Sequence, residues 1–195
     1  HASGHLGLAN AKAMEILGFD GQTADPDGGE IFKGFDGQPT GIFNETAHIN
    51  ARTRIPKPSA QWLETSLKQS IDHILANGIT SFHEAGSGAS GVELYHKLLR
   101  RDELKIRLYV MLSGDDEDLL SDYFAKGIFM DSLHRLTIRS VKLYADGALG
   151  SRGAWLLKAY SDAPGKFGHN VRDMEALDKL TLAATQAGFQ VCTHA

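Results

Sequence analysis

The sequence predicts an α/β fold with a parallel sheet, on the evidence of element order, hydrophobic spacing and composition. After Pro58, stretches with apolar residues at helical spacing alternate four times with short apolar runs typical of strands. Alternation at the length of successive βα units favours a parallel sheet. Hydrophobic residues make up 42% of the chain and charged residues 23%, which is ordinary for a globular protein with one sizeable core.

Four helices and four strands are expected in this region. Ser59 is the expected N-cap of the first helix, Gly78 lies just past its end, and Gly127 ends the third helix. The helices are expected at residues 63–75, 92–99, 119–124 and 174–181. The strands are expected at residues 79–82, which have the pattern of a buried strand, and at 106–112, 138–145 and 189–193. A doubly wound sheet and a (β/α)₈ barrel both begin this way, so the pattern leaves both open.

Residues 1–58 differ from the rest of the chain. A short helix is expected from Asn10 to Leu17, where Gly18 stops it, and a stretch rich in glycine and aspartate follows. Asp-Gly and Asp-Pro pairs in that stretch favour turns between short strand-like pieces such as residues 30–33. We therefore expect an insertion or lid-like segment over residues 1–58, attached to a main domain over residues 59–195.

Charge and composition exclude several classes of function. The net charge of −4 gives no basic surface for nucleic acid, and no apolar run is long enough to span a membrane. A single cysteine, Cys192, excludes an internal disulfide framework and favours a reducing, cytoplasmic location. The chain opens on His1 and stops on Ala195 directly after an apolar run, which predicts an internal fragment of a longer protein. Whether it forms a homo-oligomer is left open.

Polar residues follow several of the predicted strands at their carboxyl ends, where parallel α/β folds gather functional residues. Two candidates at the ends of different strands make a stronger signal than either alone. The positions are His83 and Glu84 after the first strand, residues 113–116 after the second, Lys142 and Asp146 in and after the third, and His194 after the fourth.

Lys142 carries the most information among these residues. Strand side chains alternate, so Lys142 faces the opposite side of the sheet from Val141 and Leu143. A buried lysine has a lowered pKa, and its neutral amine can react with CO₂ to give a carbamate, which is an oxygen ligand for metal. The alternative is a lysine that reaches solvent or pairs with Asp146.

The other candidates also have structural alternatives. His194 is either a metal ligand or a hydrogen-bonded structural residue at a strand end. His83 could bind a metal or a substrate, and Glu84 could simply pair with a nearby base. In the loop DGALGSRGA, the glycines allow close approach of a ligand and Arg152 could bind an anionic or carbonyl group. The sequence has no P-loop, dinucleotide fingerprint or nucleophile elbow.

Several segments, taken in order along the chain, resemble one family. These are GHLGLANAKAMEILG (residues 4–18), TGIFNETA (40–47), NGITSFHEAG (77–86), VKLYADGALGSRGAWLLKAYSDAPGKFG (141–168) and GFQVCTHA (188–195). Together they resemble the YtcJ-like amidohydrolases, a group of the amidohydrolase superfamily that includes N-substituted formamide deformylases. The resemblance implies a (β/α)₈ TIM barrel, of which this chain would supply about strands 2 to 5.

The resemblance also implies a metal site and a reaction. One or two divalent metals, expected to be zinc, would activate water for hydrolysis of a carbon–nitrogen bond in an amide-like small molecule. On the strand count above, Lys142 matches the fourth-strand lysine, expected to be carboxylated, and His194 matches the fifth-strand histidine. Candidate substrate contacts are His5, His83, Glu84, Asp146 and Arg152.

The departures from the family pattern limit what the chain can do alone. It contains no HxH motif of the first strand, no sixth-strand histidine and no eighth-strand aspartate, which would be the general base. A catalytic zinc normally has three protein ligands, so we expect the isolated chain to bind metal poorly and to be inactive. The alternatives are a non-catalytic α/β module that binds a ligand or partner, and a metal-dependent deaminase or isomerase on the same barrel.

Overall fold

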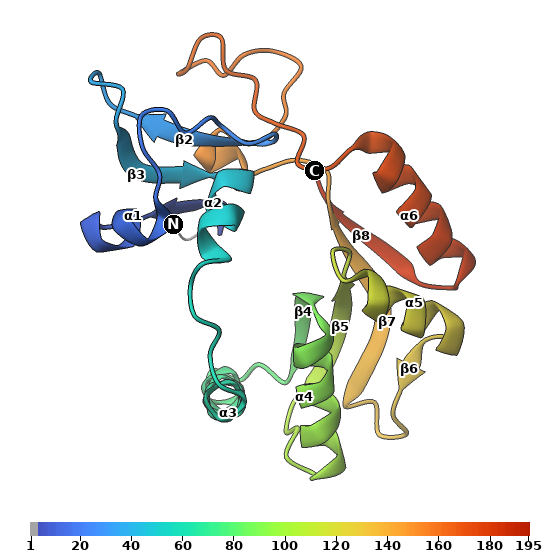
Figure 1. The fold of residues 1–195 in the computed structure, drawn as a ribbon. Helices are drawn as coiled ribbons and strands as arrows, with labels where there is room; N and C mark the ends of the chain where they lie inside the picture. The colour runs from blue at the N-terminus through green and yellow to red at the C-terminus, as the bar shows by residue number, and fades with distance from the viewer. Residues whose placement is uncertain (1–3) are drawn as a thin grey trace. The chain divides into compact units, whose positions relative to one another are not determined.

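The computed structural model describes residues 4–195, which form two compact units (Figure 1). Unit 1 comprises the chain up to Lys57, residues 144–174 and residues 194–195. Unit 2 comprises residues 58–143 and 175–193. Residues 144–174 therefore group with the N-terminal segment, while the division into domains after residue 58 stays a prediction. No helix in the described part of the chain is long and apolar enough to cross a membrane.

Unit 2 is built around a mixed sheet. Its strands are β4 (Ser81–Ser87), β5 (Arg107–Ser113), β6 (Phe129–Met130), β7 (Leu136–Tyr144) and β8 (Gln190–His194). The order is β4-β5-β7-β6, and β8 also pairs with β7. The pairs β4–β5 and β5–β7 are parallel, as the sequence predicts, whereas the short β6 is antiparallel to β7 and was not foreseen.

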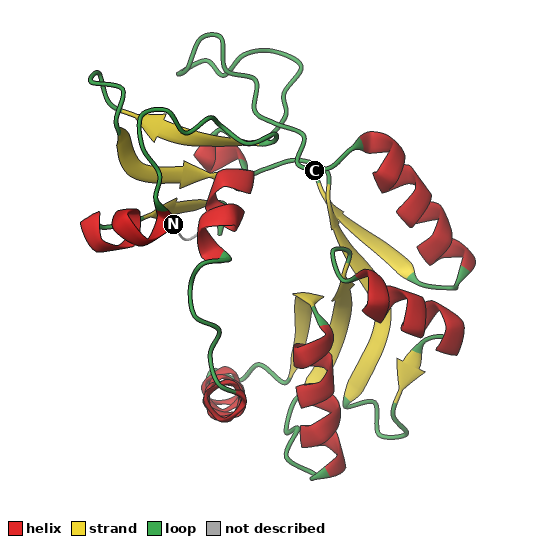
Figure 2. Ribbon diagram, in the orientation of Figure 1, coloured by secondary structure: helices red, strands yellow, loops and turns green. Residues whose placement is uncertain are grey.

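Four helices alternate with these strands (Figure 2). They are α3 (Ala60–Ala76), α4 (Ala89–Arg100), α5 (Glu117–Lys126) and α6 (Met174–Gln186). Ser59 caps α3 by accepting a hydrogen bond from the Trp62 amide, and Gly127 ends α5, as expected. The helices and the long strands thus appear where the hydrophobic spacing predicts them.

The core of unit 2 lies on one face of the sheet. Leu108, Val110 and Leu112 of β5 are buried, and the residues between them are more exposed. In β7 the register to β5 shifts between Ile138 and Ser140, which changes the phase of the alternation. After the shift Ser140, Val141 and Leu143 are buried. Lys142 lies between Val141 and Leu143 in the strand and faces the opposite side of the sheet from them, as the sequence predicts.

Strand β4 differs from its prediction. The sequence predicts a buried strand at residues 79–82, but β4 begins at Ser81, and Ile79 and Phe82 are exposed. The reason is its position in the sheet: among the described residues β4 pairs only with β5, so one of its edges has no neighbouring strand.

Unit 1 contains a regular layer where the sequence predicts an irregular excursion. Strands β1 (Leu6–Leu8), β2 (Gly29–Lys33) and β3 (Pro39–Asn44) form an antiparallel sheet in the order β1-β3-β2. Helices α1 (Ala11–Leu17) and α2 (Glu45–Arg52) accompany the sheet. The apolar core consists of Leu17, Ile31, Phe43, Ala47 and Ala51. A 3-10 turn, η1 (Leu149–Ser151), lies in the glycine-rich loop after β7.

Candidate functional site

The glycine-rich loop of unit 1, residues 145–154, folds around the side chain of Glu45. A Cβ atom added to Gly147 or to Gly153 would overlap the Glu45 carboxyl group, so these two positions accept only glycine without rearrangement. The Gly153 amide donates to the Ala148 carbonyl at 3.0 Å and the Gly147 amide to the Gly153 carbonyl at 3.3 Å. The glycines therefore close the loop and let a carboxylate approach its backbone.

Glu45 is a buried acid at the first position of α2, with 3% of its surface exposed. Its carboxylate accepts hydrogen bonds from the Ser151 hydroxyl at 3.3 Å and from the Ala148 amide at 3.4 Å. The other oxygen is 2.7 Å from Nδ1 of His5, and a carboxylate only accepts, so this nitrogen carries the proton. Buried charge is tolerated when it is bound in this way.

His5 in turn lies against His194. The two imidazole rings stack with their centroids 4.9 Å apart and their planes at 27°. Nε2 of His194 lies 3.1 Å from the Gly147 carbonyl, which can only accept, so Nε2 carries the proton. In the neutral imidazole of His194, this hydrogen bond leaves Nδ1 as the nitrogen with a lone pair.

Two buried acceptors beside this loop lack hydrogen-bond partners among the described residues. They are Oδ1 of Asn44 and Oδ1 of Asp146. The other atoms of both side chains are bound, since Asn44 donates to the Ser151 carbonyl and Asp146 accepts from the Trp155 amide at 2.7 Å. A buried acceptor without a donor is unfavourable, so these oxygens are positions at which a donor from a ligand or water would bind.

Arg152, the predicted anion-binding residue, pairs with Asp162 of the same unit. Its guanidinium donates to both carboxylate oxygens, at 3.2 and 2.8 Å, and both side chains are exposed. Its hydrogen bond with Asp162 raises the pKa of Arg152. Its role as a substrate contact stays a prediction.

Lys142 lies in unit 2, on β7 opposite Ser113 of β5. Desolvation lowers the pKa of its amine, against a smaller opposing effect of Cys192. The direction is the one that carbamate formation needs, because the neutral amine is the reactive form. Lys142 and His194 fall in different units, so their participation in one metal site stays a prediction, as does the ion pair with Asp146.

His83 and Glu84 are neighbours on β4 of unit 2. The His83 ring is exposed and stacks on Tyr109 of β5 at a centroid distance of 4.8 Å. Glu84 is half-buried, and desolvation raises the pKa of its carboxyl group. The two side chains point to opposite faces because they are adjacent in a strand.

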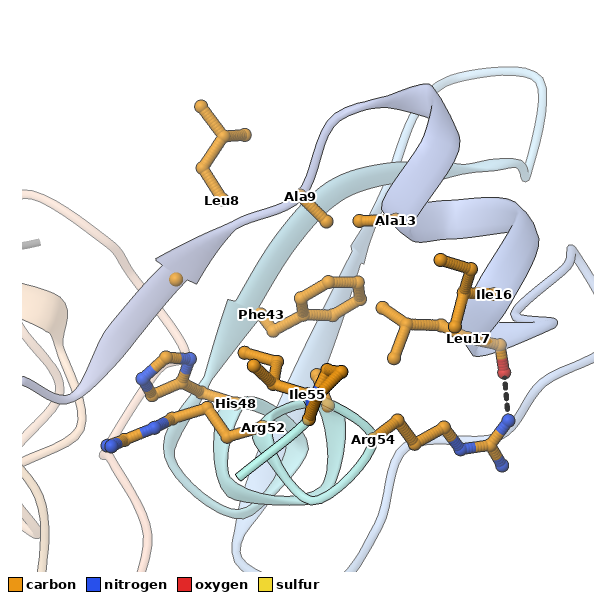
Figure 3. Close-up of a pocket in the computed structure, with 13 residues that line it drawn as sticks. Leu8, Ala9, Ala13, Ile16, Leu17, Phe43, His48, Arg52, Arg54 and Ile55 are labelled. Carbon is orange, nitrogen blue, oxygen red and sulfur yellow. Dashed lines mark hydrogen bonds between the residues drawn. The ribbon is translucent and has the colours of Figure 1, made fainter. Parts of the chain in front are cut away.

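Unit 1 also has an apolar cavity of about 220 Å³ (Figure 3). Its walls include Leu17, Phe43 and Ile55, and Arg54 at its edge donates to the Leu17 carbonyl at 2.6 Å. No carboxylate lines it among the described residues, and the histidine in its wall is His48, whose pKa is lowered by burial.

The donor groups of the described residues do not make a complete metal site. No group of three or more His, Cys, Asp or Glu side chains in residues 4–195 could hold an ion together. A catalytic zinc normally has three protein ligands. Residues beyond those identified here would therefore be needed to hold a metal.

The central residue of the loop cluster, Glu45, was not among the residues singled out from the sequence. A signal was available, because Asn44 ends the strand β3 and Glu45 directly follows it, both as polar residues inside the family-like segment TGIFNETA. The role of His5 as a substrate contact stays a prediction, and its Nδ1 binds Glu45. Prediction from strand ends did not reach this site because β3 was not expected.

The family model described as "Amidohydrolase family" matches residues 1–195, so this chain belongs to the amidohydrolase family. It is 27% identical to the YtcJ amidohydrolase of Bacillus subtilis over 98% of the chain, and 24% identical to the N-substituted formamide deformylase of Arthrobacter pascens over 99%. It is also similar to a crystal structure of an uncharacterized metal-dependent hydrolase from Pyrococcus horikoshii, with a TM-score of 0.72 and 29% identity over 98% of the chain.

The chain spans little more than a third of the proteins it resembles. It covers 36% of the YtcJ amidohydrolase, 37% of the formamide deformylase and 37% of the Pyrococcus horikoshii hydrolase. The resemblance predicted from the sequence is thus confirmed at the level of family, together with an α/β fold that contains parallel strands.

Proposed function

We propose that this chain is part of a metal-dependent hydrolase that cleaves a carbon–nitrogen bond in an amide- or formamide-like small molecule. The observation that carries the proposal is the family match over the whole chain. The names of the relatives support the reaction class, since one is an amidohydrolase and another an N-substituted formamide deformylase.

We propose further that the sheet of unit 2 is a section of a (β/α)₈ barrel. Strands β4, β5, β7 and β8 follow one another in the sheet in the same order as in the chain. A doubly wound sheet reverses its strand order at a switch point, whereas consecutive barrel strands do not. The order of these four strands therefore favours the barrel.

Lys142 and His194 are the proposed metal ligands. Lys142 lies near the carboxyl end of β7 and His194 ends β8, which is the end of a barrel strand that carries functional groups. The lowered pKa of Lys142 supports its conversion to a carbamate. A divalent metal held there would lower the pKa of a bound water and polarise the substrate carbonyl.

The first test uses the 195-residue chain itself. Because the donors of residues 4–195 do not complete a metal site, we expect zinc content well below one ion per chain and no hydrolysis of N-substituted formamides or amides. Zinc is measured by mass spectrometry after dialysis, and hydrolysis by amine release. Turnover of any of these substrates by this chain would contradict the expectation.

The second test places the chain within a protein that supplies the rest of a family barrel. In that complete barrel we expect a stoichiometric content of bound metal and release of amine from the substrate. We expect the metal to be lost in Lys142→Ala and in His194→Ala. Lys12→Ala is the matched control, because Lys12 is an exposed residue paired with Glu15. Unchanged metal content in Lys142→Ala would refute its role as a ligand, and ammonia release from amino-substituted rings would favour a deaminase.

A further inference from the structure

The Glu45 carboxylate joins three segments of unit 1 that are far apart in sequence. It is bound by His5, which directly precedes β1, by the Ala148 amide and by the Ser151 hydroxyl, while Glu45 itself begins α2. The Glu45 amide donates back to the His5 carbonyl at 2.9 Å. The side chain therefore binds both the His5 segment and the loop, and the backbone binds the His5 segment a second time.

The backbone of Glu45 is held in an unfavourable conformation. Its φ angle is +46°, in the left-handed region that residues with a Cβ rarely adopt. Such strain persists only where the surroundings enforce it, and it concentrates at functional sites. An asparagine or glycine would adopt this φ angle with less strain, so what glutamate adds at this position is its longer, carboxylate-bearing side chain.

The loop, in turn, places one carbonyl on His194. Gly147 packs against the Glu45 carboxyl group, and its carbonyl accepts the Nε2 proton of His194. The loop closes through hydrogen bonds of Gly153 to Ala148 and of Gly147 to Gly153. The position of the Gly147 carbonyl therefore depends on the loop, and the loop is built around Glu45.

We infer that Glu45 is a positioning residue, which holds the loop 147–153 so that the Gly147 carbonyl fixes the imidazole of His194. The inference rests on the proposed function for the importance of His194. Glu45 reaches His194 through the loop on one side and through His5, which stacks on His194, on the other. The imidazole of His194 is thereby held in one orientation and one tautomer.

A nucleophilic triad is a different reading of the same residue types, and the geometry does not support it. In a triad the histidine lies between the serine and the acid. Here Ser151 and His5 each bind Glu45, at different oxygen atoms, so the acid is the centre of the cluster. Among the described residues no histidine lies between Ser151 and the acid, whereas the acid has donors at both of its oxygens.

The test compares Glu45→Ala and Glu45→Gln with Glu15→Gln, a glutamate on the exposed surface. Nitrogen-15 spectra of the imidazoles at pH 8 report the tautomer of His194, and amide exchange reports the loop. In Glu45→Ala we expect the Gly153 amide to exchange at least about tenfold faster, and His194 to populate both tautomers. Glu15→Gln leaves both readouts unchanged.

Glu45→Gln separates two functions of the side chain, which are to hold the loop and to bind His5. Its side-chain oxygen can still accept from Ala148 and Ser151, so loop exchange and the His194 tautomer stay as in the unchanged protein. Its amide nitrogen can only donate, so Nδ1 of His5 must become the acceptor and the His5 tautomer reverses. A variant that merely lost stability would not reverse one histidine and spare the other.

A wild-type loop and a single His194 tautomer in Glu45→Ala would overturn the inference. Should that variant not fold, Ser151→Ala removes one donor of the carboxylate and is expected to accelerate Gly153 exchange in the same direction, and an unchanged rate would overturn the inference. Neither readout needs a metal. Failure of the proposed function would instead appear as unchanged metal content in Lys142→Ala with the loop readouts intact.

Discussion

The two units bury different kinds of side chain. In the core of unit 2 the fully buried residues are almost all aliphatic, including Leu98, Val110 and Ile138. Among the described residues of unit 2, the buried polar side chains are Ser87 and Ser140. Unit 1 has an apolar core as well, but it also buries four polar or charged side chains: Asn44, Glu45, Asp146 and Ser151.

This difference indicates which kind of interaction stabilises each unit. Apolar burial is non-directional and tolerates exchange of one aliphatic residue for another of similar volume. A buried carboxylate depends on named donors at fixed positions, and losing one leaves a buried polar group unsatisfied. We therefore expect unit 2 to respond to volume, and unit 1 to respond to hydrogen-bond geometry and to close backbone approach.

The largest effect is expected in the core of unit 2. Leu98 of α4 is fully buried, so Leu98→Ala removes apolar contacts and leaves a cavity, at a cost of about 2–5 kcal/mol in the free energy of unfolding. Urea denaturation measures it. The matched control is Leu182→Ala on the exposed side of α6, which should change stability by less than about 0.5 kcal/mol. Equal effects of the two substitutions would remove the contrast between core and surface in unit 2.

The second prediction concerns the loop of unit 1. Gly153→Ala places a Cβ against the Glu45 carboxyl group, so we expect overpacking to destabilise the protein by about 1–3 kcal/mol. Gly150→Ala, three residues away in the same loop, meets no atom within 4 Å and should be close to neutral.

Gly153→Ala also tests whether Glu45 is the group that the new Cβ atom meets. Adding Glu45→Ala to Gly153→Ala removes the atoms that the new Cβ meets. The double variant should therefore be destabilised by less than the sum of the destabilisations of the two single variants. Additive effects in urea denaturation would mean that Gly153 is glycine for a reason unrelated to Glu45.

The helices and long strands of unit 2 could be predicted because their residues repeat at fixed intervals. Ser59 and Gly127 marked helix ends by known capping chemistry, and both lie where expected. The short β6 could not be predicted, because two residues carry no periodicity. The exposure of Phe82 could not be predicted either, because the position of β4 in the sheet is a property of the whole sheet.

The candidate site was predictable only in part. The face on which Lys142 lies could be predicted because strand alternation sets it independently of its partners, whereas its role as a metal ligand stays a prediction. Glu45 was missed because its role depends on the Gly147 and Gly153 backbone, about a hundred residues later in the chain. No local pattern reports a contact of that range, although the glycines in DGALGSRGA indicated that something approaches the loop closely.

The smallest expected effect is on the pH dependence of stability, and it compares Glu84 of unit 2 with Glu45 of unit 1. Glu84 of unit 2 is half-buried and desolvation raises the pKa of its carboxyl group, whereas Glu45 of unit 1 is bound by several donors. A raised pKa in the folded state means that the folded protein binds its proton more tightly than the unfolded chain. The stability this provides is present below about pH 4.5 and is lost as the pH rises through the folded-state pKa.

Glu84→Gln removes this titration, so its advantage over the unchanged protein should grow from pH 4 to pH 7. Because Glu84 is substantially solvated, screening keeps the gain below about 1 kcal/mol. Urea midpoints at the two pH values measure the change, with Glu93→Gln on the exposed face of α4 as the control. The opposite result would be a stability difference between Glu84→Gln and the unchanged protein that becomes less favourable to the variant from pH 4 to pH 7. It would show that the ionised carboxylate has a stabilising partner. Glu84 would then resemble Glu45, and the contrast between the acids of the two units would not hold.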